Sequence, residues 1–149
     1  MRLELPDLEA MQVLGTRIAV TLQIGDVIAL SGGVGAGKTT LARAIIAGLG
    51  YGGEVPSPSF AIIEVYDPPA LRMRLVHADF SRLKRSEEAD ELGLDDYRQD
   101  AALIAEWPEN AGGFGAERGC LSLALETAEK GRIAIARAGP DWLGREPWK

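Results

Sequence analysis

The chain has 149 residues, of which 46% are hydrophobic and 26% are charged, so it can bury the core of one compact domain but hardly of two. Its formal net charge of −6 argues against an autonomous, strongly basic nucleic-acid binder, and we expect no DNA partner. Work on RNA inside a larger complex stays open. Cys120 is the only cysteine, which excludes an intramolecular disulfide and favours a cytoplasmic setting. No apolar run is long enough to span a membrane and no signal peptide is indicated, so we expect no membrane partner.

The first 31 residues predict a helix followed by a strand. Hydrophobic side chains recur at spacings of three and four between residues 7 and 23, which indicates an amphipathic helix with Asp7 as its candidate N-cap. Gly25 and Asp26 then turn the chain into an apolar run, Val27–Ser31, which is typical of a buried strand.

A glycine-rich segment follows this strand directly, because residues 32–39 read GGVGAGKT and match G-x-x-x-x-G-K-T. A strand that leads through such a loop into a helix, here expected over residues 38–49, is a phosphate-binding P-loop. Glycines allow backbone N–H groups to turn toward a phosphate, and the helix dipole adds positive potential. Lys38 is expected to reach the β- and γ-phosphates, and the Thr39 hydroxyl to ligate Mg²⁺. The sequence therefore predicts a nucleoside triphosphate site.

The rest of the chain predicts mainly strands. Two prolines make residues 55–60 an extended, stiff loop, in which Ser59 is either a sensor of the γ-phosphate or a turn-capping hydroxyl. Strands are expected over 60–66 and 72–79 as an antiparallel pair, over 101–106, and over 120–127 and 132–137 as a hairpin, with one short helix over 86–94 capped by Ser86. These elements predict an α/β fold, namely a P-loop NTPase-like three-layer domain whose mixed sheet has a large antiparallel share. We expect a single ATPase domain over residues 1–138 and an irregular C-terminal tail over 139–149.

Two acids end apolar strands, where carboxylates can serve phosphate chemistry: Asp79 and Glu106. One can hold the metal with Thr39 while the other orients the attacking oxygen, and spacing alone leaves both assignments open. His77 is the only histidine, and we interpret it as a structural side chain that bonds backbone or a nearby carboxylate. Guanine-specific P-loop GTPases recognise the base with an Asn/Thr-Lys-x-Asp segment. None of the lysines in this sequence lies in such a segment, so ATP is favoured over GTP.

Five segments, in this order and spacing, resemble those of one known family: residues 30–41, 55–60 (VPSPSF), 77–83 (HADFSRL), 91–97 and 104–109 (IAEWPE). The family is TsaE (YjeE), small bacterial ATPases required for the threonylcarbamoyladenosine (t6A) modification of tRNA, and the resemblance spans about residues 5–137. It implies ATP and Mg²⁺ binding, slow hydrolysis, and action with homologues of TsaB and TsaD, which contact the tRNA. This chain departs from the family by carrying Gly33-Val34, Ser59 and Ser81 where Asp-Leu, Thr and Tyr are usual.

By position, the resemblance assigns Thr39 and Glu106 to Mg²⁺, and Asp79 to the essential acid near the γ-phosphate. With Lys38, Asp79 is the candidate catalytic residue. The candidate nucleotide-binding residues are Gly33, Gly35, Ala36, Gly37, Lys38, Thr39, Thr40, Ser59 and Arg132.

Two other functions stay open. A small-molecule kinase needs an arginine-rich lid, and only residues 80–99 can supply one, with three arginines among many acids. In a non-hydrolysing module, ATP would only order a docking surface.

Overall fold

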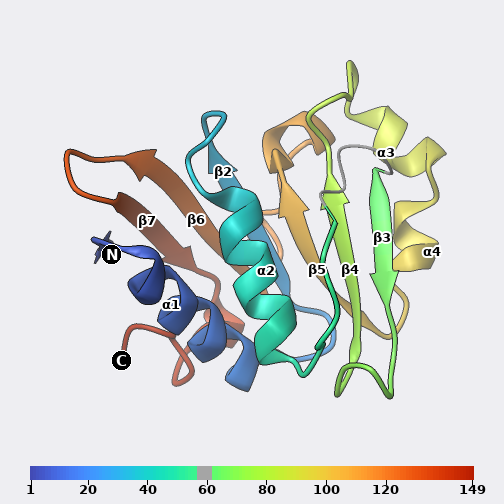
Figure 1. The fold of residues 1–149 in the computed structure, drawn as a ribbon. Helices are drawn as coiled ribbons and strands as arrows, with labels where there is room; N and C mark the ends of the chain where they lie inside the picture. Colours follow the sequence, from blue (N-terminus) through green and yellow to red (C-terminus); the bar gives the residue numbers. More distant parts are fainter. Residues whose placement is uncertain (57–61) are drawn as a thin grey trace.

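The computed structural model describes residues 1–56 and 62–149. Its helices and strands follow one another as shown in Figure 1. The strands are β1 (Arg2–Leu5), β2 (Val27–Gly32), β3 (Ile63–Tyr66), β4 (Arg74–Asp79), β5 (Ala101–Glu106), β6 (Cys120–Thr127) and β7 (Arg132–Ala138). The α-helices are α1 (Leu8–Thr21), α2 (Lys38–Gly48), α3 (Glu87–Glu91) and α4 (Leu94–Tyr97), and two 3-10 helices cover Pro108–Ala111 and Pro140–Trp142.

The strands form one mixed seven-stranded sheet in the order β1-β7-β6-β2-β5-β4-β3. Strand β2 lies between β5 and β6 and runs parallel to both, and β4 runs parallel to β5. The outer pairs β3–β4, β6–β7 and β1–β7 are antiparallel. The expected mixed sheet is therefore confirmed, and the carboxyl ends of β2, β5 and β4 meet at one edge of it.

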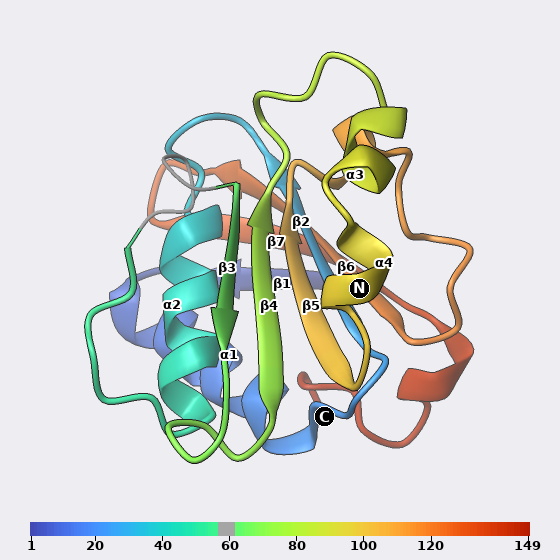
Figure 2. The same cartoon turned by 90° about the vertical axis from the view of Figure 1, so that its right-hand side faces the viewer.

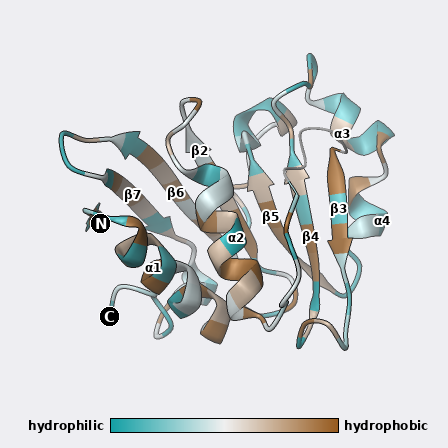
Figure 3. Cartoon of the chain, in the orientation of Figure 1, coloured by the Kyte–Doolittle hydropathy of each residue, from teal (hydrophilic) through white to brown (hydrophobic). Residues whose placement is uncertain are grey.

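Helices cover both faces of this sheet, which gives the three expected layers. Helices α1 and α2 lie on one face, and the short α3 and α4 lie on the other (Figure 2). Successive side chains of a strand point to opposite faces, so Ile28 packs in the core under α1 and α2 while Val27 packs in the core on the α3 side. Because both faces are buried, the central strands are apolar almost throughout, whereas α3 is hydrophilic (Figure 3).

The start of α1 and its contact with α2 follow from short-range chemistry. The Asp7 carboxylate accepts a 2.8 Å hydrogen bond from the Ala10 N–H, which confirms the predicted N-cap. Glycines let the two helices approach closely, since a methyl group on Gly48 would lie 2.7 Å from Cβ of Ala19. This packing fixes α2, whose first two residues, Lys38 and Thr39, are the last two of the glycine-rich motif.

Two local predictions differ from the structure. The segment expected as one helix over 86–94 is divided into α3 and α4, because Gly93 adopts a left-handed φ of 80° between them. Ser86 precedes α3 but makes no capping hydrogen bond with its side chain. Strand β1 was not predicted, because its four residues form a strand only through their pairing with β7 at the far end of the sequence.

The segment after β7 packs against the body of the domain. Trp142 is fully buried, and its indole N–H donates a 2.8 Å hydrogen bond to the Gly119 carbonyl. Arg145 makes a bidentate ion pair with Asp26, at 2.7 and 2.8 Å. Because Asp26 immediately precedes β2, these contacts fix the tail at the end of β2 opposite the P-loop. None of the helices that the structure describes has the length and apolar composition to cross a membrane.

Candidate phosphate-binding site

The glycine-rich loop joins the end of β2 to the start of α2, as predicted. Three of its glycines have a positive φ: Gly32 (135°), Gly35 (78°) and Gly37 (107°). A side chain on Gly32 would also collide with the Leu125 carbonyl of β6. A positive φ is accessible to glycine but strained for other residues. The glycines of the motif are therefore needed for the conformation of the loop.

Lys38 is the first residue of α2 and is almost completely buried. Its ammonium group donates 2.7 Å hydrogen bonds to the carbonyls of Gly32 and Gly33. It also lies 4.6 Å from the centroid of the Trp107 ring, a cation–π contact. The charge is thus held above the loop by neutral groups, which phosphate oxygens can replace with stronger, charge-assisted bonds.

Glu106 links the loop to the neighbouring strands. At the end of β5, its Oε1 accepts a 2.9 Å hydrogen bond from the Thr39 hydroxyl, and its Oε2 lies 2.6 Å from Nε2 of His77. Asp79 ends β4 and is the register partner of Glu106 on β5. Its Oδ1 accepts a 2.8 Å hydrogen bond from the Ser81 N–H, so it also caps the turn after β4. The two candidate acids therefore lie side by side, and Glu106 is the one in contact with Thr39.

This donor set fits a magnesium ion. Mg²⁺ prefers hard oxygen ligands and usually keeps several waters and phosphate oxygens in its shell. Thr39 and Glu106 supply one hydroxyl and one carboxylate, and among residues 1–56 and 62–149 no group of three His, Cys, Asp or Glu is arranged to hold a metal alone. The pair would therefore hold Mg²⁺ together with the triphosphate, rather than as a separate protein cage.

Arg132 lies on β7, far from the glycine-rich loop in the sequence, but its side chain reaches this loop. Its guanidinium donates to the carbonyls of Ala36 at 3.2 Å and Gly35 at 3.1 Å. It borders a cavity of about 210 Å³ next to the loop, whose lining residues are Leu5, Asp7, Leu8, Met11, Gly37, Thr40, Gly131 and Arg132. The apolar contribution of Leu5 and Met11 was missed from the sequence, because nothing in their local pattern distinguishes them from ordinary core positions.

The structure thus brings most of the predicted site residues together. Gly33, Gly35, Ala36, Gly37, Lys38, Thr39 and Thr40 form the loop and the first turn of α2. Asp79, Glu106 and Arg132 surround them from three different strands. Ser59 lies outside the described residues.

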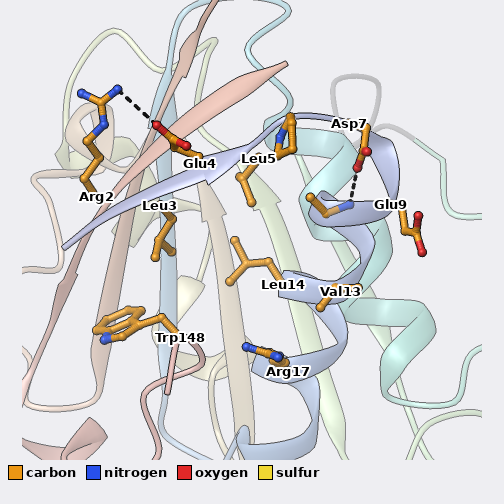
Figure 4. A pocket seen from close by; sticks show the side chains of 12 residues that line it. Arg2, Leu3, Glu4, Leu5, Asp7, Glu9, Val13, Leu14, Arg17 and Trp148 are labelled. Atoms are coloured by element: carbon orange, nitrogen blue, oxygen red, sulfur yellow. Dashed lines mark hydrogen bonds and ion pairs between the residues drawn. The ribbon is translucent and has the colours of Figure 1, made fainter. Parts of the chain in front are cut away.

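A larger cavity, of about 740 Å³, lies elsewhere between β1, α1 and Trp148. Figure 4 shows Leu3, Leu5 and Leu14 pointing into it, with charged side chains around the rim. Of these, Arg2 lies 3.9 Å from Glu4 and the Asp7 carboxylate is used as the α1 cap. None of the residues of the glycine-rich loop lines this cavity, although it shares Leu5 and Asp7 with the smaller cavity beside Gly37.

Comparison with known proteins identifies the family. The family model for threonylcarbamoyl adenosine biosynthesis protein TsaE matches residues 5–134. The tRNA threonylcarbamoyladenosine biosynthesis protein TsaE of Streptomyces coelicolor is 43% identical over 100 residues, which cover 66% of this chain and 68% of that protein. The TsaE protein of Bacillus subtilis is 36% identical over 118 residues, which cover 78% of this chain and 65% of that one.

A solved structure supports the fold independently. The crystal structure of Bacillus subtilis YdiB superposes with a TM-score of 0.69, covering 97% of this chain and 88% of YdiB at 24% identity. The family match spans the glycine-rich loop, both acids and Arg132, which are the parts that the fold assembles into one site. The chain therefore belongs to the TsaE family and takes part in the biosynthesis of threonylcarbamoyladenosine in tRNA.

Proposed function

We propose that this protein is a magnesium-dependent ATPase that serves the t6A modification of tRNA. The observation that carries the proposal is the convergence of Lys38, Thr39 and Glu106 on one glycine-rich loop, with Asp79 on the adjacent strand. The loop binds phosphates, and the hydroxyl of Thr39 with the carboxylate of Glu106 suits Mg²⁺. The carboxylate of Asp79 remains available to orient the attacking water.

Each residue then has a distinct role. Lys38 exchanges its carbonyl partners for the β- and γ-phosphates. Thr39 and Glu106 hold Mg²⁺, which would neutralise charge that develops on the phosphate oxygens. Asp79 orients the attacking water near the γ-phosphate. The adenine base occupies the cavity beside Arg132, where apolar walls and polar groups are combined as in most small-molecule sites.

Hydrolysis by the isolated protein is expected to be slow. Catalytically fast P-loop enzymes place an arginine against the transferring phosphate, but here the guanidinium of Arg132 is engaged by loop carbonyls. We infer that homologues of TsaD and TsaB are the partners and that tRNA is reached through them. This inference is supported by the relatives, which are named as tRNA threonylcarbamoyladenosine biosynthesis proteins.

The kinase alternative has less support. A kinase lid needs free arginines to clamp the transferred phosphate. Within residues 80–99, Arg98 makes a bidentate pair with Glu117 at 2.6 and 3.0 Å, and Arg85 lies within 4.0 Å of three carboxylates. These two charges are therefore already compensated inside the protein.

The substitution Asp79→Asn tests the proposal against the non-hydrolysing module. The variant is expected to bind ATP as the wild type does, because the amide keeps the shape and still accepts from Ser81, but to lose hydrolysis. Calorimetry with Mg²⁺·ATP and a phosphate-release assay measure the two properties, and Asp96→Asn on the exposed face of α4 is the matched control. If Asp79→Asn still supports t6A formation together with the TsaB and TsaD homologues, the module is correct and the ATPase proposal is wrong.

A further inference from the structure

His77 is a completely buried side chain on β4 with a single polar contact among the described residues. Its Nε2 lies 2.6 Å from Oε2 of Glu106, while Nδ1 has no hydrogen-bond partner in the part of the chain that the structure describes. Here the hydrogen-bonding capacity of the ring is directed at one candidate metal ligand.

The polarity of this contact follows from the chemistry of the two groups. An ionised carboxylate can only accept hydrogen bonds, so Nε2 of His77 carries the hydrogen and donates it. The other carboxylate oxygen accepts from Thr39 at 2.9 Å. Glu106 is therefore held at both oxygens, and because it is buried the orientation of the carboxylate is determined by these two donors.

The two donors to Glu106, Thr39 and His77, differ in whether their hydrogen bond is kept when a cation binds. The Thr39 hydroxyl lies in the first turn of α2 and has lone pairs of its own for a metal, so its bond to Glu106 would change when Mg²⁺ binds. His77 lies on a central strand, between β3 and β5 in the sheet, where the backbone is fixed on both sides. Only the histidine therefore gives Glu106 an anchor that is independent of the ligand.

We propose that His77 is a positioning residue for the magnesium site, which orients the Glu106 carboxylate before Mg²⁺·ATP binds. This inference rests on the proposed function. Groups that hydrogen-bond to metal-binding carboxylates commonly contribute about 10- to 100-fold to metal affinity, because the ligand does not have to be ordered when the metal binds. The histidine is not a ligand and does not contact the phosphates.

The test compares His77→Leu with His77→Gln in untagged protein. Leucine fills much of the space but donates nothing, whereas the glutamine amide offers an N–H close to the position of Nε2. The measurement is the Mg²⁺ concentration that half-saturates ATP binding, with binding in EDTA and the thermal unfolding midpoint as companion readouts. We expect His77→Leu to raise the half-saturating Mg²⁺ concentration about tenfold and leave ATP binding in EDTA unchanged, and His77→Gln to stay within about threefold of wild type.

A purely structural histidine would behave differently, because its loss would lower the unfolding midpoint while each folded molecule kept the wild-type Mg²⁺ requirement. Folded His77→Leu protein with an unchanged requirement would overturn the inference alone. Wild-type protein whose ATP binding ignores Mg²⁺ would overturn the proposed function as well.

A second measurement needs no variant. Since His77 is the only histidine, its ring ¹⁵N signals can be assigned directly in NMR spectra. Adding Mg²⁺ to protein saturated with a non-hydrolysable ATP analogue should shift the Nε2 signal. The reason is that Nε2 donates its hydrogen bond to Glu106, and Mg²⁺ bound to Glu106 would change the charge near this bond. An Nε2 signal that does not move would overturn the inference even if His77→Leu fails to fold.

Discussion

Replacing Lys38 by Met removes the ammonium group but keeps an unbranched apolar side chain of similar length at this buried position. In the free protein the ammonium makes two hydrogen bonds to the carbonyls of Gly32 and Gly33 and one cation–π contact. Binding of ATP exchanges these for bonds to phosphate, each worth about 1.5–3 kcal/mol. The lost carbonyl bonds offset about half of that gain, so the net loss in Lys38→Met should be about 2–3 kcal/mol. This corresponds to about 30- to 150-fold weaker binding of Mg²⁺·ATP.

Isothermal titration calorimetry with Mg²⁺ present measures this affinity, and circular dichroism verifies that the variant is folded. Lys130→Met is the matched control, because it removes the same charge from the exposed β6–β7 turn, and it should bind like wild type. A folded Lys38→Met protein with unchanged affinity would refute the argument that the Lys38 ammonium exchanges its carbonyl partners for phosphate oxygens when ATP binds. Equal losses in both variants would instead indicate a general electrostatic effect.

Three further outcomes follow from contacts in the structure. Arg132→Leu should weaken ATP binding roughly tenfold by calorimetry, because two bonds to loop carbonyls are lost, while Arg137→Leu on the same strand should not; equal affinities would contradict this. Arg145→Ala leaves a buried carboxylate unpaired and should lower the free energy of unfolding in urea by about 3–5 kcal/mol. The exposed pair removed in Arg118→Ala should cost less than about 1 kcal/mol, and similar losses would refute the distinction. Burial raises the pKa of the Cys120 thiol, so iodoacetamide should alkylate it slowly in native protein and rapidly in concentrated urea; rapid native alkylation would show that the thiol is accessible.

Much of the fold follows from local patterns in the chain. The apolar run before the glycine-rich loop, the helix spacing after it and the Asp7 cap depend on neighbours within a few residues, and all three are confirmed. The local signal failed where one residue decides the outcome. Gly93 has a left-handed conformation that separates α3 from α4, although the acidic stretch reads as one helix.

The site shows the same division. The loop residues and the two strand-end acids are visible in the sequence, since a phosphate loop is one contiguous motif and an acid at the end of an apolar run has a clear local pattern. The sequence does not show which of the two acids contacts Thr39. Spacing cannot decide whether Thr39 meets Asp79 or Glu106, because the answer depends on the strand order β2-β5-β4, in which β5 and not β4 lies next to β2.

The sequence by itself determined the glycine-rich loop between a strand and a helix, two candidate acids and the mixed sheet, because each depends on the period and composition of short segments. Tertiary structure alone decided that Glu106 bonds both Thr39 and His77, that Arg132 of β7 reaches Ala36, and that Arg145 pairs with Asp26. These contacts join residues 29 to 119 positions apart. Strand order and register bring them together to bury the two faces of one sheet, and no local pattern encodes that arrangement.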